Sequence, residues 1–186
     1  MAMRFWLTAI LMLGPLAGQV TQSLDLSTKS ARAARKKYYV IFAARGGSAT
    51  GHAFVLWGVE DDVHRRSTIR AYGLYPANSH DACNSVYRKV AGAVVDESTN
   101  HGITNITEEL IVKVDRADFE RARAVERVWD CRHEFAILDR DCVEFVRAVG
   151  AALNLDIPTR TPARWTPRAY VRALMARRFL LRSHRG

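Results

Sequence analysis

The sequence predicts an α+β protein in which a small antiparallel sheet packs against helices. Runs with the composition of β-strands gather at residues 38–44, 52–59 and 67–75. Apolar residues with helical spacing follow from residue 115 onward. With 186 residues, of which 48% are hydrophobic, the chain is long enough for one globular domain with a sizeable core.

The first 18 residues have the pattern of a secretory signal peptide. Arg4 precedes an apolar run that Gly14-Pro15 interrupts. A bilayer crossing needs about 20 apolar residues, so the run favours a cleaved signal over a permanent N-terminal anchor. The protein is therefore expected to be periplasmic or secreted, with membrane anchoring by residues 1–18 as the alternative. Residues 19–37 are polar and then basic, and we expect them to form a linker.

The net charge of +9 is concentrated at the two ends of the chain. Residues 1–37 and 160–186 are basic, whereas residues 38–159 carry more acidic than basic side chains. A folded region with a net negative charge argues against specific nucleic-acid binding. The basic ends are instead expected to face an anionic membrane or cell-envelope surface.

The strands are predicted from composition and alternation. In the run 52–59 both faces are apolar, as in a strand that is covered on both sides. The run 67–75 is expected to pair with it as a hairpin, and 110–114 is expected to be a further strand. Residues 77–106 show no such pattern and are predicted to be long and irregular, either a lid or a surface loop.

Helices are predicted from capping residues and apolar spacing. Asp115 is expected to cap a helix that reaches about Trp129. Asp141, with Glu144 three residues later, resembles a capping box, and Cys142 would occupy the first helical position.

A last helix is predicted from Pro167, with Thr166 as its cap, to about Leu181. Basic residues recur every four positions there and would line one helical face: Arg160, Arg164, Arg168 and Arg172. We expect residues 160–186 to form a basic amphipathic helix. It would either dock on the domain with a solvated arginine face or lie on an anionic surface.

Cys142 and His52 are the candidate nucleophile and base. Backbone N–H groups in the first turn of a helix favour a thiolate and can stabilise a negative carbonyl oxygen. The negative charges of Asp141 and Glu144 would raise the thiol pKa, so the positive partner that lowers it would be His52 as imidazolium. The alternative is that both residues are structural, a packed cysteine and a core histidine.

Two motifs resemble a known family. Gly51-His52-Ala53-Phe54-Val55 on an early strand and Asp141-Cys142-x-x-Phe145-Val146 at a helix start are similar to the circularly permuted NlpC-type branch of the papain-like fold. Relatives of that branch include lecithin:retinol acyltransferase-like proteins. The resemblance covers about residues 38–153 and implies a papain-like domain over 38–159. It also implies His52 as general base, Cys142 as nucleophile and, for a bacterial exported protein, cell-wall peptide as substrate. The family often has Ser-Gly where this chain has Val143-Glu144.

The third catalytic position of that family is a polar residue on the next strand that orients the histidine. With a hairpin turn near Asp62 and Val63, the position facing His52 falls near residues 72–74, and Tyr72 is the nearest polar candidate. The alternative is that Tyr72 is an aromatic strand residue without a catalytic role.

The remaining cysteines and histidines are not spaced like metal ligands, and we expect neither a metal nor a cofactor. In an exported protein the odd number of cysteines is compatible with a Cys83–Cys131 disulfide, the alternative being that all three thiols are reduced.

The leading functional hypothesis is a thiol hydrolase or acyltransferase that attacks an amide or ester carbonyl of a peptide or related substrate through an acyl-enzyme on Cys142. One alternative is a non-catalytic binding module of the same fold that docks on an anionic surface. The other is a membrane lipid acyltransferase that uses the basic C-terminal segment.

Overall fold

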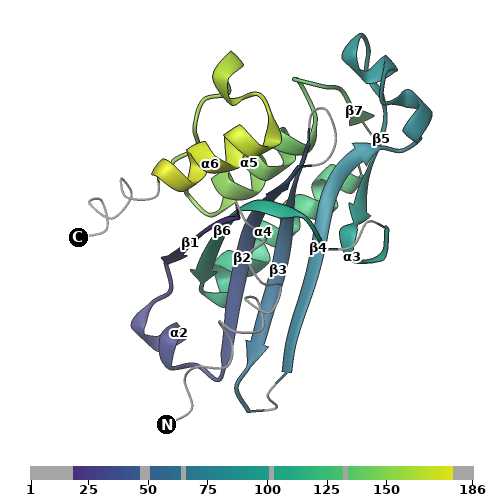
Figure 1. Cartoon of the computed structure of the whole chain (residues 1–186). Helices are drawn as coiled ribbons and strands as arrows, with labels where there is room; N and C mark the ends of the chain where they lie inside the picture. Colours follow the sequence, from purple (N-terminus) through teal and green to yellow (C-terminus); the bar gives the residue numbers. More distant parts are fainter. Residues whose placement is uncertain (1–18, 47–50, 64–65, 101–102, 132–133, 178–186) are drawn as a thin grey trace.

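A mixed sheet of seven strands forms the centre of the protein (Figure 1). The computed structural model describes residues 19–46, 51–63, 66–100, 103–131 and 134–177. Within these ranges the sheet has the order β1-β6-β2-β3-β4-β5-β7, and all neighbouring strands are antiparallel except β1 and β6. The strands are β1 (Val20–Asp25), β2 (Lys36–Arg45), β3 (His52–Asp61), β4 (Arg66–Pro76), β5 (Val90–Asp96), β6 (Ile106–Val114) and β7 (Glu134–Phe135).

Five α-helices and three short 3-10 helices accompany the sheet in the described residues, which confirms the predicted α+β class. The α-helices are α2 (Lys29–Ala33), α3 (Glu97–Asn100), α4 (Arg116–Asp130), α5 (Cys142–Ala152) and α6 (Pro167–Arg177). The 3-10 helices are η1 (Ser79–Asp81), η2 (Asn84–Val86) and η3 (Pro162–Arg164).

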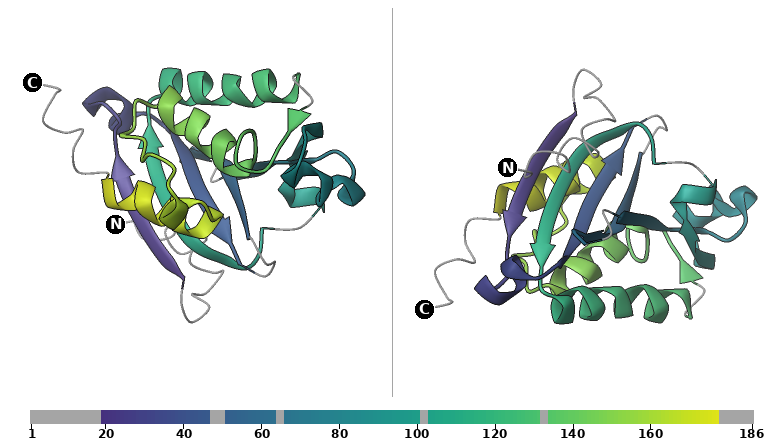
Figure 2. Two further views of the ribbon diagram at one scale, coloured as in Figure 1. Left: turned by 90° about the horizontal axis from the view of Figure 1, so that it is seen from above. Right: turned by 90° about the horizontal axis from the view of Figure 1, so that it is seen from below.

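The main core lies between the sheet and the three longest helices, α4, α5 and α6, which lie together on one face (Figure 2). Along β3, alternate residues take part in different clusters because successive side chains of a strand point to opposite faces. Ala53 and Val55 contribute to the main core, whereas Phe54 and Leu56 contribute to a second apolar cluster with Ile41 on the other face. The expectation that both faces of this strand are apolar and covered is confirmed.

Two segments have more regular structure than expected. The predicted linker 19–37 contains β1, whose side chains are mostly polar and which pairs in parallel with β6 at the edge of the sheet. Residues 77–106 contain β5, which pairs with β4, followed directly by α3. Both predictions were wrong because sheet pairing with distant residues, rather than local alternation, stabilises these strands.

The predicted basic face of the C-terminal helix is largely occupied by contacts within the protein. Arg160 lies before the helix, and α6 begins at Pro167, where Thr166 Oγ1 accepts a hydrogen bond from the N–H of Ala169. Arg168 Nε lies 2.9 Å from Oε1 of the fully buried Glu108 of β6, and Arg172 pairs with the same oxygen. These pairs hold α6 against the sheet, so Arg168 and Arg172 do not form a purely solvated face.

Within the described ranges, no helix is long and apolar enough to cross a membrane. The predicted signal or anchor segment, residues 1–18, lies outside the described residues.

Candidate active site

His52 belongs to a buried polar cluster of four side chains. Its Nε2 atom lies 2.9 Å from Oε1 of Glu97, whose side chain is completely buried. The Tyr75 hydroxyl donates a 2.7 Å hydrogen bond to the same carboxylate oxygen, and Arg45 pairs with the other oxygen. Arg45 Nη2 also donates to the Tyr75 hydroxyl at 2.6 Å. We call Arg45, His52, Tyr75 and Glu97 the His52 cluster.

Four different elements supply this cluster. Arg45, the last residue of β2, pairs directly with His52, the first residue of β3, while Tyr75 comes from β4 and Glu97 begins α3. The imidazole stacks on the Tyr75 ring with a centroid separation of 4.1 Å. Gly73 makes room for the contact between His52 and Glu97, since a Cβ atom at that position would overlap both side chains. The cluster therefore depends on the absence of a side chain at residue 73.

The Glu97 carboxylate is ionised in this environment. Burial raises its pKa, but hydrogen bonds from His52 and Tyr75 and the positive charges of His52 and Arg45 outweigh that effect, so the pKa lies below the ordinary glutamate value. Burial and the neighbouring Glu97 raise the pKa of Tyr75, which keeps its hydroxyl as a hydrogen-bond donor. The imidazole thus faces a permanent negative charge.

Cys142 is the first residue of α5, and its side chain is buried. Its sulfur is hydrogen-bonded by the backbone N–H groups of Ala53 and Val143. Burial and the negative charge of Asp141 raise the thiol pKa to about 12, although the two N–H groups and Arg160 act in the opposite direction. Because the thiol pKa is so high, the resting thiol is protonated at neutral pH.

The thiol and the imidazole lie near the same end of β3 but on opposite faces of the sheet. The pairing of β3 with β4 begins at Val55 opposite Tyr72, so residues 52–54 lie where the two strands separate. The thiol is bonded to the Ala53 N–H on the helix-covered face, where Ala53 and Cys142 share the main core. The imidazole lies on the other face, stacked on Tyr75 and 6.0 Å from the Phe54 ring centroid. Folding thus brings the thiol to the residue next to His52, while the resting imidazole is directed to Glu97.

The expectation that Tyr72 faces His52 is wrong. Asp61 pairs with Arg66, so the turn lies further along the chain than expected, and Tyr72 is opposite Val55. Continuing this register by three residues places Tyr75 opposite His52. Tyr72 packs against the main core on the helix-covered face. The side chain that contacts the imidazole nitrogen is instead Glu97, which also accepts a hydrogen bond from Tyr75.

Arg45, Tyr75 and Glu97 were not identified from the sequence. The apolar run Val90–Val95, which ends at Asp96, was a usable signal for a strand, and an acidic residue directly after it would have been a candidate for the site. No local pattern indicated that Glu97 would lie beside His52, because that contact depends on the pairing of β4 with β5.

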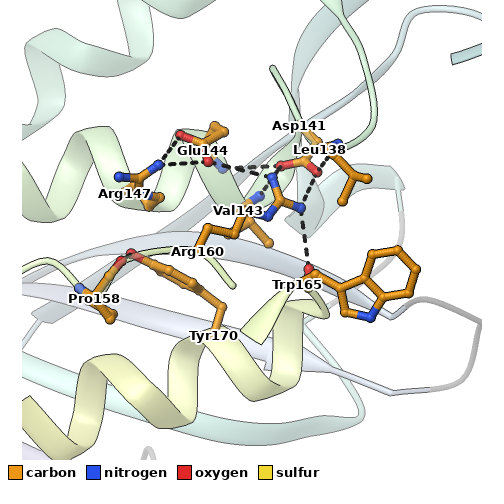
Figure 3. A network of polar contacts seen from close by, with 9 residues as sticks. All are labelled: Leu138, Asp141, Val143, Glu144, Arg147, Pro158, Arg160, Trp165 and Tyr170. Carbon is orange, nitrogen blue, oxygen red and sulfur yellow. Dashed lines mark hydrogen bonds and ion pairs between the residues drawn. The ribbon is translucent and has the colours of Figure 1, made fainter. Parts of the chain in front are cut away.

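A second polar network surrounds the start of α5 (Figure 3). Asp141 caps the helix as predicted: its Oδ1 atom accepts hydrogen bonds from the N–H groups of Val143 at 3.0 Å and Glu144 at 3.2 Å. The predicted capping box is not formed, because Glu144 pairs with Arg147 at 2.8 Å and approaches Arg160 at 3.5 Å. The Glu144 carboxylate therefore binds these two arginines and not the backbone N–H of Asp141, as a capping box would require.

Cys83 and Cys131 are exposed free thiols, so the possible disulfide between them is not present. In the part of the chain that the structure describes, His, Cys, Asp and Glu side chains do not gather into a group of three or more that could hold a metal ion.

The chain matches no protein family model, no curated protein and no solved structure.

Proposed function

We propose that this protein is a cysteine-dependent hydrolase or acyltransferase that forms an acyl-enzyme on Cys142, with His52 as the base. The observation that carries the proposal is the contact of His52 Nε2 with the buried, ionised Glu97 at the same end of β3 where the Cys142 sulfur meets the Ala53 N–H. A carboxylate behind an imidazole orients the ring and stabilises its protonated form. Glu97 takes the positioning role that the sequence assigned to Tyr72.

The proposed reaction follows from these positions. His52 accepts the thiol proton, the sulfur forms a bond to the carbonyl carbon of an amide or ester, and the amine or alcohol leaves with that proton. Water or an acceptor nucleophile then releases the acyl group from sulfur. The N–H groups of Ala53 and Val143 stabilise the thiolate. Because Nε2 is held by Glu97, Nδ1 is the nitrogen that accepts the thiol proton, and the transfer requires the imidazole to move toward α5 when substrate binds while Nε2 keeps its contact with Glu97.

The proposed substrate class is a peptide. If a bacterium exports the protein, that peptide is cell-wall peptide. This part of the proposal rests on the resemblance of the two motifs to the NlpC-type branch. Periplasmic or secreted localisation belongs to the same proposal.

One observation favours a second candidate, a non-catalytic binding module of the same fold. The thiol is buried, with its pKa raised to about 12, and the imidazole is paired with Glu97 instead of with sulfur. In that case the His52 cluster is a structural ion network, and Cys142 only packs against β3.

Transfer of an acetyl group from p-nitrophenyl acetate distinguishes the two candidates without knowledge of the natural substrate. We expect a burst of p-nitrophenol and an acetylated Cys142 peptide in mass spectra of the full chain. In Cys142→Ser only the slower acetylation of the exposed Cys83 and Cys131 should remain. Acetylation of Cys142 should be at least about tenfold slower in His52→Ala, because general-base catalysis contributes roughly 100-fold or more. Cys83→Ser is the matched control for thiol loss and should keep the Cys142 burst. Equal acetylation of Cys142 in His52→Ala and the wild type would support the binding module.

A further inference from the structure

Arg160 connects the start of α5 to the segment that precedes α6. Its guanidinium binds Asp141 with both ends: Nη1 lies 3.0 Å from Oδ1 and Nη2 lies 2.6 Å from Oδ2. Nη2 also donates to the backbone carbonyl of Trp165 at 3.3 Å (Figure 3). The side chains of both partners are largely buried, at 12% exposure for Arg160 and 7% for Asp141. A two-point pair of this kind fixes the orientation of the carboxylate as well as its charge.

The same carboxylate is bonded to the backbone around Cys142. Oδ2 accepts a 3.0 Å hydrogen bond from the N–H of Leu138, and Oδ1 accepts from Val143 and Glu144. The Val143 N–H is also one of the two groups that bond the thiol. The orientation of Asp141 therefore determines where its negative charge lies relative to the sulfur. It also determines how the Val143 N–H is shared between the carboxylate and the sulfur.

We propose that Arg160 is a positioning residue that controls the reactivity of Cys142 through Asp141. By neutralising the carboxylate and holding Oδ1 on the helix N-terminus, the guanidinium limits the repulsion between Asp141 and a developing thiolate. The opposite effects of Asp141 and Arg160 on the thiol pKa are consistent with this role. The inference rests on the proposed function for its catalytic consequence, but thiol reactivity itself can be measured independently.

Three other charged groups lie near the start of α5: Arg140, whose guanidinium lies over the Trp129 ring, Glu144 and His52. Glu144 is bound by Arg147 on the same helix and lies 3.5 Å from Arg160. From β3, His52 lies on the other face of the sheet and is bound to Glu97. Arg147 touches Glu144 and not Asp141, so it provides a matched control for the loss of an arginine at this end of α5.

The test is the rate at which iodoacetamide alkylates Cys142, followed by peptide mass spectrometry on the full chain between about pH 7 and 9.5. Below the thiol pKa the rate follows the thiolate fraction, which changes tenfold per pKa unit, partly offset by the change in nucleophilicity. We expect Arg160→Gln to slow alkylation about threefold or more at each pH. Asp141→Asn, which keeps a capping side chain, should accelerate it by a similar factor.

Three further variants complete the test. In the Asp141→Asn background, Arg160→Gln should slow alkylation less than it does in the wild type, because the charge that it compensates is gone and only the direct effect of the guanidinium on the thiol remains. Arg147→Gln should stay within about twofold of the wild type, and Arg160→Lys, which keeps the charge but not the two-point geometry, should fall between the wild type and Arg160→Gln.

A purely structural role gives a different result. If Arg160→Gln and Asp141→Asn both accelerate alkylation, the two changes expose Cys142 by loosening the fold, and the inference is overturned. Equal rates in Arg160→Gln and Arg147→Gln would also overturn it. Failure of the proposed function is seen separately, as His52-independent acetylation, and leaves the opposite signs of the Arg160 and Asp141 effects unchanged.

Discussion

Replacing Asp141 by alanine is expected to lower the free energy of unfolding by about 4 kcal/mol. Loss of a helix N-cap costs roughly 1 kcal/mol, and removal of one partner of a buried ion pair costs about 3–5 kcal/mol because the other charge is left uncompensated. Arg160 would be that charge: both its ends bind Asp141 in a largely buried position, and only Glu144, 3.5 Å from Nη1, would remain as a counter-charge, so the lower end of that range applies. Urea unfolding at neutral pH measures the loss as a lower midpoint.

Glu144→Ala is the control on the same helix turn. Glu144 pairs with Arg147, whose side chain is 34% exposed, and exposed or half-exposed pairs contribute at most about 1 kcal/mol. A loss in Asp141→Ala no larger than that in Glu144→Ala would show that the Asp141–Arg160 pair contributes little to stability.

Replacing Glu97 by glutamine is expected to lower the free energy of unfolding by about 3 kcal/mol at neutral pH, because Arg45 and His52 lose their buried counter-charge. The folded-state pKa of Glu97 is depressed. Its stabilisation is therefore complete above the ordinary glutamate pKa and is lost as the pH falls through the folded-state pKa. The difference between wild type and Glu97→Gln should narrow in acid, as measured by urea unfolding over a pH series.

Tyr75→Phe is the matched control for Glu97→Gln. It removes one hydrogen bond to Glu97 without changing a formal charge, and it should cost about 1 kcal/mol. A difference between wild type and Glu97→Gln that stays constant with pH would contradict the ionised state of Glu97.

The parts of the fold that were predicted correctly are those that a short stretch of sequence indicates by itself. The run at residues 52–59 is apolar on both faces, and pairs as a hairpin with the run that follows. Asp141 and Thr166 are side chains that accept hydrogen bonds from N–H groups in the first turn of the next helix. Such signals need only a few neighbouring residues, so one sequence is enough to read them.

The parts that were missed depend on long-range pairing. β1 has an unremarkable polar sequence and is a strand because β6 lies beside it. A difference in the position of the hairpin turn moved the residue opposite His52 from Tyr72 to Tyr75, because the strand register determines which side chain faces which. Glu97 reaches His52 only through the pairing of β4 with β5.

For the candidate site, the sequence predicted that Cys142 starts a helix and that His52 lies on a strand, but not the partners of the two side chains. Cys142 starts α5, and its sulfur lies at the residue next to His52. Alternation along β3 directs the imidazole to the face opposite Ala53, where it meets Glu97. A high thiol pKa follows from burial beside Asp141, and neither local motif shows the depth of that burial.

The central claim, that His52 serves as the base for Cys142, is tested most directly by the pH dependence of Cys142 acetylation by p-nitrophenyl acetate in a single turnover. With a thiol pKa of about 12, an unassisted thiol reacts in proportion to its thiolate fraction, and its rate rises about tenfold per pH unit across the neutral range. We predict that the wild-type rate levels off once the imidazole is neutral, whereas the rate of His52→Ala continues to rise. The same unbroken rise in both proteins would contradict the account.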